Sequence, residues 1–325
     1  MALLTDSWND KPAKFAGACL KIKLAFGSAV VVTNFERALV NRVRPSGIHC
    51  GLSVTTTNAI NTTTVMICVN PNQTFLNMER TLLLTEIETL LNCAQFKDYC
   101  PNGLQIQGHN SITKIACAVT ASAAVIEQAT LWGADALLVH HGYFWRGEDA
   151  SIVGMKYQRV RRLMQADMNL IAYHLPLDAH PVLGNNAQLG LKLGLSAQGQ
   201  SPIEPLVWFG EHSANLTIGA FCTQITDVLG RTPLLIGEPR ARLGRVAWCT
   251  GGAQDYIHIA AQLGANTYIS GEVSERTYHE ARELGINYLA CGHHATERFG
   301  IQALGEYLAQ QFGLDYQFFD ENNPV

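Results

Sequence analysis

Imidazole and carboxylate side chains stand directly after four short apolar runs of this sequence, at residues 136–139, 170–173, 267–270 and 286–290. Short apolar runs of this kind are typical of buried strands in parallel sheets, and such sheets bind ligands at the carboxyl ends of their strands. The side chains concerned are, in chain order, His140, His141, His174, Asp178, Glu272, His293 and Glu297. Residues of these types bind divalent ions through nitrogen and oxygen atoms, so their positions predict a metal site.

Each of these residues also has an ordinary explanation. Adjacent residues of a strand point to opposite faces, so His140 and His141 could be one buried and one surface histidine. They share a site only where the strand ends and the backbone turns, which Gly142 permits. Asp178 could instead cap a helix that begins near Asn185, or simply end a loop.

The spacing of His293 and Glu297 places them on one face of a helix, within about 6 Å of each other. This is the spacing at which helical histidine pairs bind zinc, although a surface hydrogen bond explains a single such pair equally well. His294 points to another side of the helix and is expected to be a neighbour rather than a ligand. Taken together, the residues at the four strand ends favour the metal interpretation.

The expected ligands contain no thiolate, which suits Zn, Fe, Mn, Co or Ni better than a structural cysteine-rich zinc site. Five side chains that include a bridging carboxylate can hold two ions about 3.5–4 Å apart and leave positions open for water. The sequence lacks a Walker loop, a G-x-G-x-x-G motif and a G-x-S-x-G motif. Phosphate-loop, dinucleotide-binding and serine-hydrolase functions are therefore excluded.

An internal repeat indicates how the chain positions these residues. Residues 115–141 align without a gap onto residues 246–272, with five identities in the 27 aligned positions. Each copy contains an apolar run, a helical pattern that ends at Gly133 or Gly264, and a second apolar run. Both copies continue alike, with helices expected at 155–167 and 274–284, each followed by a further strand.

Strand–helix–strand–helix–strand, twice over, predicts an α/β fold of two related lobes with largely parallel sheets. The metal site is expected between the lobes, at the carboxyl ends of the strands. We expect the first lobe at residues 78–195, a connecting and decorating segment at 196–243, and the second lobe at 244–325.

Residues 1–77 differ in charge and composition from the rest of the chain. They carry seven Lys/Arg and three Asp/Glu, whereas residues 78–325 carry 16 Lys/Arg and 24 Asp/Glu. They contain a Thr/Asn-rich run and few patterned apolar positions, so we expect an extension that is disordered or not part of the native fold. Met78 is then the expected natural start. Their one apolar stretch, residues 24–32, is too short to span a bilayer, which needs about 20 residues.

The composition sets further limits on the class of protein. Nine cysteines are scattered with no C-x-x-C pair, which fits reduced thiols in a cytoplasmic protein. The acidic balance of residues 78–325 argues against nucleic-acid binding on the outer surface, and no membrane association is expected.

Several motifs resemble those of the NIF-three-like family, whose bacterial members are known as type 2 GTP cyclohydrolase I homologues. They are YCPNGLQ (99–105), VTAS (119–122), VHHGYFW (139–145), HLPLDAH (174–180) and GHHATER (292–298). The resemblance covers essentially all of residues 78–325. It implies two divalent ions per chain and a homohexameric ring with the metals facing an internal cavity. It also implies that five of the seven residues at the strand ends are the ligands, with Glu297 as the bridge: His140, His141, Asp178, His293 and Glu297.

Two functions are compatible with this resemblance. In a metal-dependent hydrolase, metal-activated hydroxide attacks a nucleotide-like small molecule, with C8 of GTP as one candidate position. His174 and Glu272 would then transfer protons or orient ligands. The alternative is a non-enzymatic metal-binding carrier or assembly protein of the same fold, whose ligand-saturated site would leave no position open for water.

Overall fold

The computed structural model describes residues 19–25, 53–55, 62–68 and 77–325, which fall into two compact units, Met1–Leu76 and Asn77–Val325. In the first unit, β1 (Cys19–Ala25), β3 (Thr62–Cys68) and β2 (Ser53–Thr55) form an antiparallel sheet in the order β1-β3-β2. The expectation of an unpacked extension at residues 1–77 falls largely on residues outside those described, and it stays a prediction.

The first lobe of the second unit is built on a five-stranded sheet in the order β16-β7-β8-β9-β5. Its four strands β16, β7, β8 and β9 run parallel, and β5 pairs antiparallel with β9. The strands are β5 (Gly103–Ile106), β7 (Lys114–Thr120), β8 (Ala136–His141), β9 (Asn169–Ala172) and β16 (Asp315–Phe318). β4 (Met78–Glu79) and β6 (Ser111–Ile112) form a separate, two-stranded antiparallel sheet.

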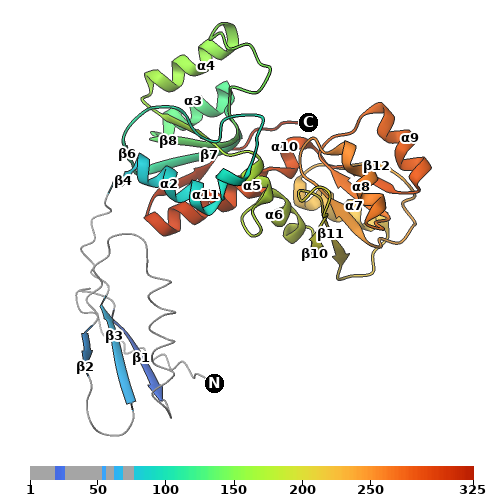
Figure 1. Ribbon diagram of the computed structural model, residues 1–325, viewed down its shortest axis with the longest axis horizontal. Coiled ribbons are helices and arrows are strands. Elements are labelled where there is room, and N and C mark those ends of the chain that lie inside the picture. Colours follow the sequence, from blue (N-terminus) through green and yellow to red (C-terminus); the bar gives the residue numbers. More distant parts are fainter. Residues whose placement is uncertain (1–18, 26–52, 56–61, 69–76) are drawn as a thin grey trace. The chain divides into compact units, whose positions relative to one another are not determined.

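Helices cover both faces of this sheet, as Figure 1 shows. Leu137 and Val139 of β8 face one core with α3 (Ala123–Trp132) and α4 (Gly154–Gln165). Leu138, between them, faces the opposite core with α2 (Arg80–Leu90) and α11 (Arg298–Phe312). The alternation follows from the two-residue period of a strand, and burial on both faces explains why β8 reads as a continuous apolar run.

The second lobe is built on a six-stranded sheet in the order β10-β11-β13-β14-β15-β12. The three central strands β13, β14 and β15 are parallel, and antiparallel strands flank them on both sides. The strands are β10 (Leu195–Gln200), β11 (Trp208–His212), β12 (Leu234–Ile236), β13 (Val246–Trp248), β14 (Thr267–Ser270) and β15 (Asn287–Ala290).

Helices also cover both faces of the second sheet. One core contains residues of α6 (Asn185–Lys192) and α7 (Ile218–Leu229) around the fully buried Trp248. The other contains residues of α8 (Ile257–Gln262) and α9 (Glu275–Leu284) around Tyr268 and Tyr288. The chain is thus a mixed α/β protein, as its alternating strand and helix patterns predict.

The lobes do not divide where the sequence suggested. Residues 298–318, expected in the second lobe, belong to the first, because α11 packs on β7 and β16 extends the first sheet. Gly305 permits this close approach, since a Cβ there would lie 2.6 Å from Cys117 Sγ. Conversely, α6 lies in the second lobe, and the strands of the expected connecting segment at 196–243 are full members of the second sheet.

The chain therefore crosses between the lobes twice within the second unit. The first crossing follows α5 (Leu175–Ala179) and leads into α6, and the second follows α10 (His293–Thr296) and leads into α11. Figure 1 shows the short helices α5 and α10 between the two sheets. Asp178 and Glu297 lie at the two crossing points, so the fold itself brings them together.

None of the helices in the described part of the chain has the length and apolar composition of a membrane span. The cysteines of the second unit are free thiols: Cys93, Cys100, Cys117, Cys222, Cys249 and Cys291.

Candidate metal centre

His140 and His141 lie at the end of β8, and both rings contribute to the same cluster. His140 is fully buried, and its Nδ1 donates to the carbonyl oxygen of Tyr173 at 3.0 Å. His141 Nδ1 lies 3.4 Å from Thr120 Oγ1, and the centroids of the two imidazoles are 4.6 Å apart. The end of β8 thus places both adjacent histidines at one site, rather than leaving one in the core and one at the surface.

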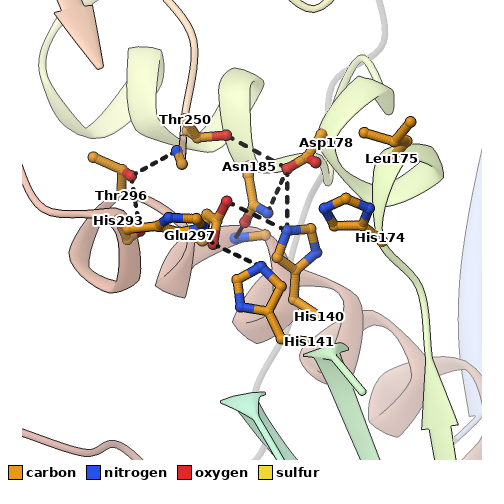
Figure 2. Close-up of polar contacts among 12 residues, drawn as sticks. His140, His141, His174, Leu175, Asp178, Asn185, Thr250, His293, Thr296 and Glu297 are labelled. Atoms are coloured by element: carbon orange, nitrogen blue, oxygen red, sulfur yellow. Dashed lines mark hydrogen bonds and ion pairs between the residues drawn. The ribbon is translucent and has the colours of Figure 1, made fainter. Parts of the chain in front are cut away.

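Glu297 lies at the centre of the cluster, where α10 meets α11. Its Oε1 is 3.5 Å from His140 Nε2, and its Oε2 is 3.3 Å from His141 Nε2 and 3.2 Å from His293 Nε2. Figure 2 shows His140 and His141 pointing toward this carboxylate. Gly251 makes room for it, because a Cβ at that position would lie 2.1 Å from Glu297 Oε1 and its φ is +69°.

Asp178 forms the opposite side of the cluster. Its Oδ1 is 3.5 Å from His140 Nε2 and accepts hydrogen bonds from Asn185 Nδ2 at 2.9 Å and Thr250 Oγ1 at 3.4 Å. Asn185 in turn accepts from the backbone N–H of Gly300 at 3.0 Å. Asp178 does not cap α6, the alternative that its sequence position left open. Instead, Asn185 and Thr250 of the second lobe hold its carboxylate toward His140.

Two groups of possible ligands share Glu297. His140, Asp178 and Glu297 form one group, in which the ligand atoms all lie within 4.8 Å of one another. His141, His293 and Glu297 form a second group that meets the same limit. Because Glu297 offers one oxygen to each group, its carboxylate can bridge two ions. Three protein ligands for an ion would leave further positions open, as in catalytic metal sites.

The donor atoms have the chemistry that a cation requires. A carbonyl oxygen only accepts, so His140 Nδ1 carries a proton, and once Nε2 is deprotonated it presents a lone pair on the side of two carboxylates. His140 Nε2 and Glu297 Oε2 are both buried without a hydrogen-bond partner. Buried polar atoms are rarely left in this state, and acceptors that face each other need a positive charge between them. The residues present therefore fit a divalent metal.

Protonation follows the same electrostatics. Burial disfavours the charged form of His140, but the carboxylates of Asp178 and Glu297 raise its pKa to about 9. The pKa of His293 is also raised to about 9, against its burial, by Glu297 and Glu272. Burial lowers the pKa of His141 to about 3, which keeps that ring neutral. The cluster attracts positive charge, and a bound metal would have to displace protons.

The pKa values of the two carboxylic acids move in opposite directions. Burial raises the pKa of Asp178, although His140 acts against this change. Burial would also raise the pKa of Glu297, but His141 and His140 hold it well below its usual range. The central Glu297 is therefore the group most firmly kept ionised, as a bridging ligand requires.

Glu272 and His174 lie next to the ligand groups, and each pairs with another side chain. His293 Nδ1 donates to Glu272 Oε1 at 2.7 Å, which turns His293 Nε2 toward Glu297. His174 Nδ1 donates to Asp98 Oδ1 at 2.7 Å, and its ring centroid lies 5.0 Å from that of His140. A carboxylate that binds the outer nitrogen of a histidine fixes its tautomer and orientation.

Asp98 is one site residue that sequence reasoning missed. Besides His174, it accepts hydrogen bonds from Asn102 Nδ2 and the backbone N–H of Leu175, both at 2.9 Å. Burial would raise its pKa, but the hydrogen bonds from His174 and Asn102 lower it to about 2. Asp98 stands just before the YCPNGLQ motif and follows no apolar strand, so inspection of strand ends could not find it.

His174 also belongs to two further groups that meet the distance limit, one with His140 and His141 and one with Asp98 and Cys100. The second is a poor metal site, because burial raises the pKa of the Cys100 thiol to about 12 and a metal binds the thiolate. The first would make His174 a third imidazole ligand. The hydrogen bond from His174 to Asp98 is compatible with either role, a metal ligand or a group that transfers protons.

His294 and two further histidines, His258 and His279, do not contribute to the cluster. His294 Nε2 pairs with Asp320 Oδ1 at 2.8 Å, consistent with a neighbour on another side of the helix. The side chains of His258 and His279 are 57% and 61% exposed, and each lies near a surface glutamate.

A cavity of about 600 Å³ opens beside the ligand groups. His141, His174, Asp178, His293 and Glu297 contribute to its wall, and so do residues of both lobes farther from the cluster. This volume is within the range of about 300–1,000 Å³ that is typical of small-molecule sites. The candidate ligands are therefore accessible to a substrate.

Residues 78–324 are similar in sequence and structure to a group of known proteins. The family described as Duf34/NIF3 (NGG1p interacting factor 3) matches residues 78–324. A protein of Vibrio cholerae serotype O1 named "GTP cyclohydrolase 1 type 2 homolog" is 52% identical over 248 residues, which are 74% of this chain and 98% of that protein. A protein of the same name from Escherichia coli (strain K12) is 50% identical over 246 residues, 74% of this chain and 99% of its own. A solved structure described as "protein ybgI, unknown function" is 49% identical, with a TM-score of 0.73, and covers 76% of this chain and all of that one.

Proposed function

The chain belongs to the Duf34/NIF3 family, and we propose that it is a hydrolase that depends on two divalent metal ions bound between its lobes. The ligands in this proposal are His140, His141, Asp178, His293 and Glu297. The observation that carries it is the sharing of Glu297 between two groups of ligand atoms. The family's relatives are named for a cyclohydrolase, which makes a nucleotide such as GTP the first substrate to test.

Divalent ions at these ligands would lower the pKa of water and polarise an oxygen or nitrogen atom of the substrate. The protein's own contribution is to hold the ligands in a fixed arrangement. Glu272 holds His293 by its outer nitrogen, and the carbonyl of Tyr173 holds His140 in the same way. Such outer contacts keep each Nε2 directed into the site.

In this proposal His174 moves protons at the edge of the site. Its Nδ1 donates to Asp98, so the neutral ring keeps an unprotonated Nε2. The ring centroid of His174 lies 5.0 Å from that of His140 and 5.8 Å from that of His141, and its side chain is 15% exposed. A general base needs a free lone pair, a fixed orientation and access to the substrate. His174 has all three.

The competing function is a metal-binding carrier or assembly protein. A carrier saturates its ion with protein ligands, whereas a hydrolase needs open positions and room for a substrate. The cavity of about 600 Å³ against His141, His293 and Glu297 favours the hydrolase.

Two further features belong to the same proposal. One is an internal duplication, supported by the parallel order β7-β8-β9 in the first sheet and β13-β14-β15 in the second. The other is assembly into a homohexameric ring with the metal sites facing an internal cavity. Native mass spectrometry of the purified protein would test the assembly.

An activity screen tests the function. The purified protein is reconstituted with Zn, Fe, Mn, Co or Ni and assayed against nucleotides and phosphoesters, with Glu297→Ala as the control. We expect metal-dependent turnover of at least one substrate, abolished in the control. A protein that holds two ions and turns over no member of the panel would favour the carrier.

A further inference from the structure

Arg159 lies in the wall of the cavity that contains the candidate metal ligands. It belongs to α4, one residue before the buried Val160 and four before the buried Leu163. These two apolar side chains anchor the helix on the first sheet. Arg159 is therefore presented by a packed element rather than by a free loop.

The guanidinium of Arg159 has no partner among the described residues. Its Nε is buried without a hydrogen bond, and neither an ion pair nor a cation–π contact is formed by its side chain within residues 77–325. By contrast, Arg146 donates to the backbone oxygen of Asp98 and lies over the Tyr99 ring. Arginine cannot lose its proton in a protein, so an unpaired and partly buried guanidinium favours an anion from outside.

Aromatic rings line the same cavity from both lobes. Tyr99 and Trp145 belong to loops of the first lobe, and Tyr256 ends the short helix η2 (Gln254–Tyr256) of the second. Trp145 lies edge-on to His174 with centroids 5.0 Å apart, and 5.9 Å from His141. Tyr99 is 56% exposed. Rings placed in this way offer apolar faces to a planar group beside the metal ligands.

We propose that Arg159 binds the anionic group of the substrate while the aromatic residues of the cavity pack against its planar ring. The ligand class is a phosphate ester of a nucleoside. The planar guanidinium fork matches phosphate oxygens with two parallel hydrogen bonds, and a cavity of about 600 Å³ accommodates a ligand of this size. The proposal rests on the proposed function only in that the substrate reacts at the metal ligands. Because Arg159 would contact the phosphate and not a metal ion, it is a specificity-determining residue.

Calorimetric titration with guanosine 5′-monophosphate, guanosine and ribose 5-phosphate tests this assignment. The protein is compared with Arg159→Gln, Arg159→Lys and a matched control, Arg161→Gln, which removes the same charge from an exposed position of α4. Each variant is first checked for an unchanged melting temperature and metal content. The titrations are run on metal-loaded protein and on protein stripped with a chelator.

Guanosine monophosphate should bind more tightly than either guanosine or ribose 5-phosphate. Arg159→Gln should weaken the nucleotide about 10- to 100-fold, as expected for loss of charge-assisted hydrogen bonds, and change guanosine by less than about twofold. Arg159→Lys should recover part of the loss, and Arg161→Gln should bind like the unmodified protein.

The proposal is overturned if Arg159→Gln keeps the preference for nucleotide over nucleoside, or if the unmodified protein binds neither. The stripped protein separates this outcome from failure of the proposed function. A preference that depends on Arg159 and survives without metal supports the anion site whatever the metals do. A preference that vanishes with the metal assigns phosphate binding to the ions and contradicts the role of Arg159.

Discussion

Replacement of Asp98 by asparagine tests the contact that orients His174. The change keeps the size of the side chain but removes its charge and one acceptor oxygen. Asp98 accepts hydrogen bonds from His174 Nδ1 at 2.7 Å and from Asn102 and Leu175 at 2.9 Å, and its side chain is only 3% exposed. An amide cannot accept hydrogen bonds from all of these donors. The folded protein should therefore be less stable, and His174 should no longer be held in one tautomer.

The magnitude follows from the pKa of Asp98. The hydrogen bonds in the folded protein lower it from 3.8 to about 2. Each pKa unit corresponds to about 1.4 kcal/mol, so ionised Asp98 contributes about 2 kcal/mol to the free energy of unfolding at neutral pH. For a carboxyl group with a depressed pKa, this contribution is present above the unfolded value and is lost as the pH falls through the folded one. It should have dropped to about half near pH 3.

Urea unfolding from pH 7 to pH 3 measures this contribution. The free energy of unfolding of Asp98→Asn should lie about 2 kcal/mol below that of the unmodified protein at pH 7, and the difference should shrink toward pH 3. Asp149→Asn is the control, because it removes a carboxylate that binds only the nearby Ser151 at the surface. It should leave the free energy of unfolding nearly unchanged.

Two results would refute this reasoning. One is a difference below about 0.5 kcal/mol at pH 7, which is typical of a surface charge change. The other is a difference that grows as the pH falls. The metal content of Asp98→Asn should stay normal, because no proposed ligand has been removed.

Three further predictions concern ligand roles, domain organisation and pH. His174→Ala should keep its metal but bind it about 10- to 100-fold more weakly, and His294→Ala should lower the metal affinity by less. Loss of metal from His294→Ala but not from His293→Ala, measured by elemental analysis, would contradict the chosen helix face. A chain that begins at Met78 should fold, assemble and bind metal with a melting temperature within a few degrees of the full chain, because the second unit contains both sheets and the whole cluster; insolubility or loss of metal would count against it. Metal binding should release protons and weaken as the pH falls below about 9, because His140 and His293 have raised pKa values; equal heats in buffers of different ionisation enthalpy would show that no proton is released.

The sequence predicted the elements well because local signals determined them. The run at 267–270 is β14 itself, and the helix expected to end at Gly133 does so, with that glycine at a φ of +78°. Buried parallel strands are continuous apolar runs, and glycine caps helices in the left-handed conformation, so both signals can be read from neighbouring residues.

The sequence did not predict which sheet each element joins. No local pattern distinguishes a helix that covers its own sheet from one that crosses to another, and the apolar face of α11 fits either core. The assignment of residues 298–318 depends on the contact between α11 and β7, between residues almost 200 positions apart. The sequence did not identify Asp98 as a site residue for a related reason, because its partner His174 is 76 residues away.

The candidate ligands that follow strands of one sheet could be expected near one another, because parallel strands end at the same edge of their sheet. Their division into two groups could not be found in this way. That division depends on the orientation of each ring, which the contacts of His140 with Tyr173 and of His293 with Glu272 determine.

The most direct test of the central claim is the number of metal ions per chain, measured by elemental analysis after reconstitution, in the unmodified protein and in Glu297→Gln. Glutamine keeps the shape of the bridge and removes the charge shared by the two ligand groups. The account predicts close to two ions per chain in the unmodified protein and loss of most of both in the variant. One ion or none in the unmodified protein, or a variant that still holds both, would contradict a pair of ions bridged by Glu297.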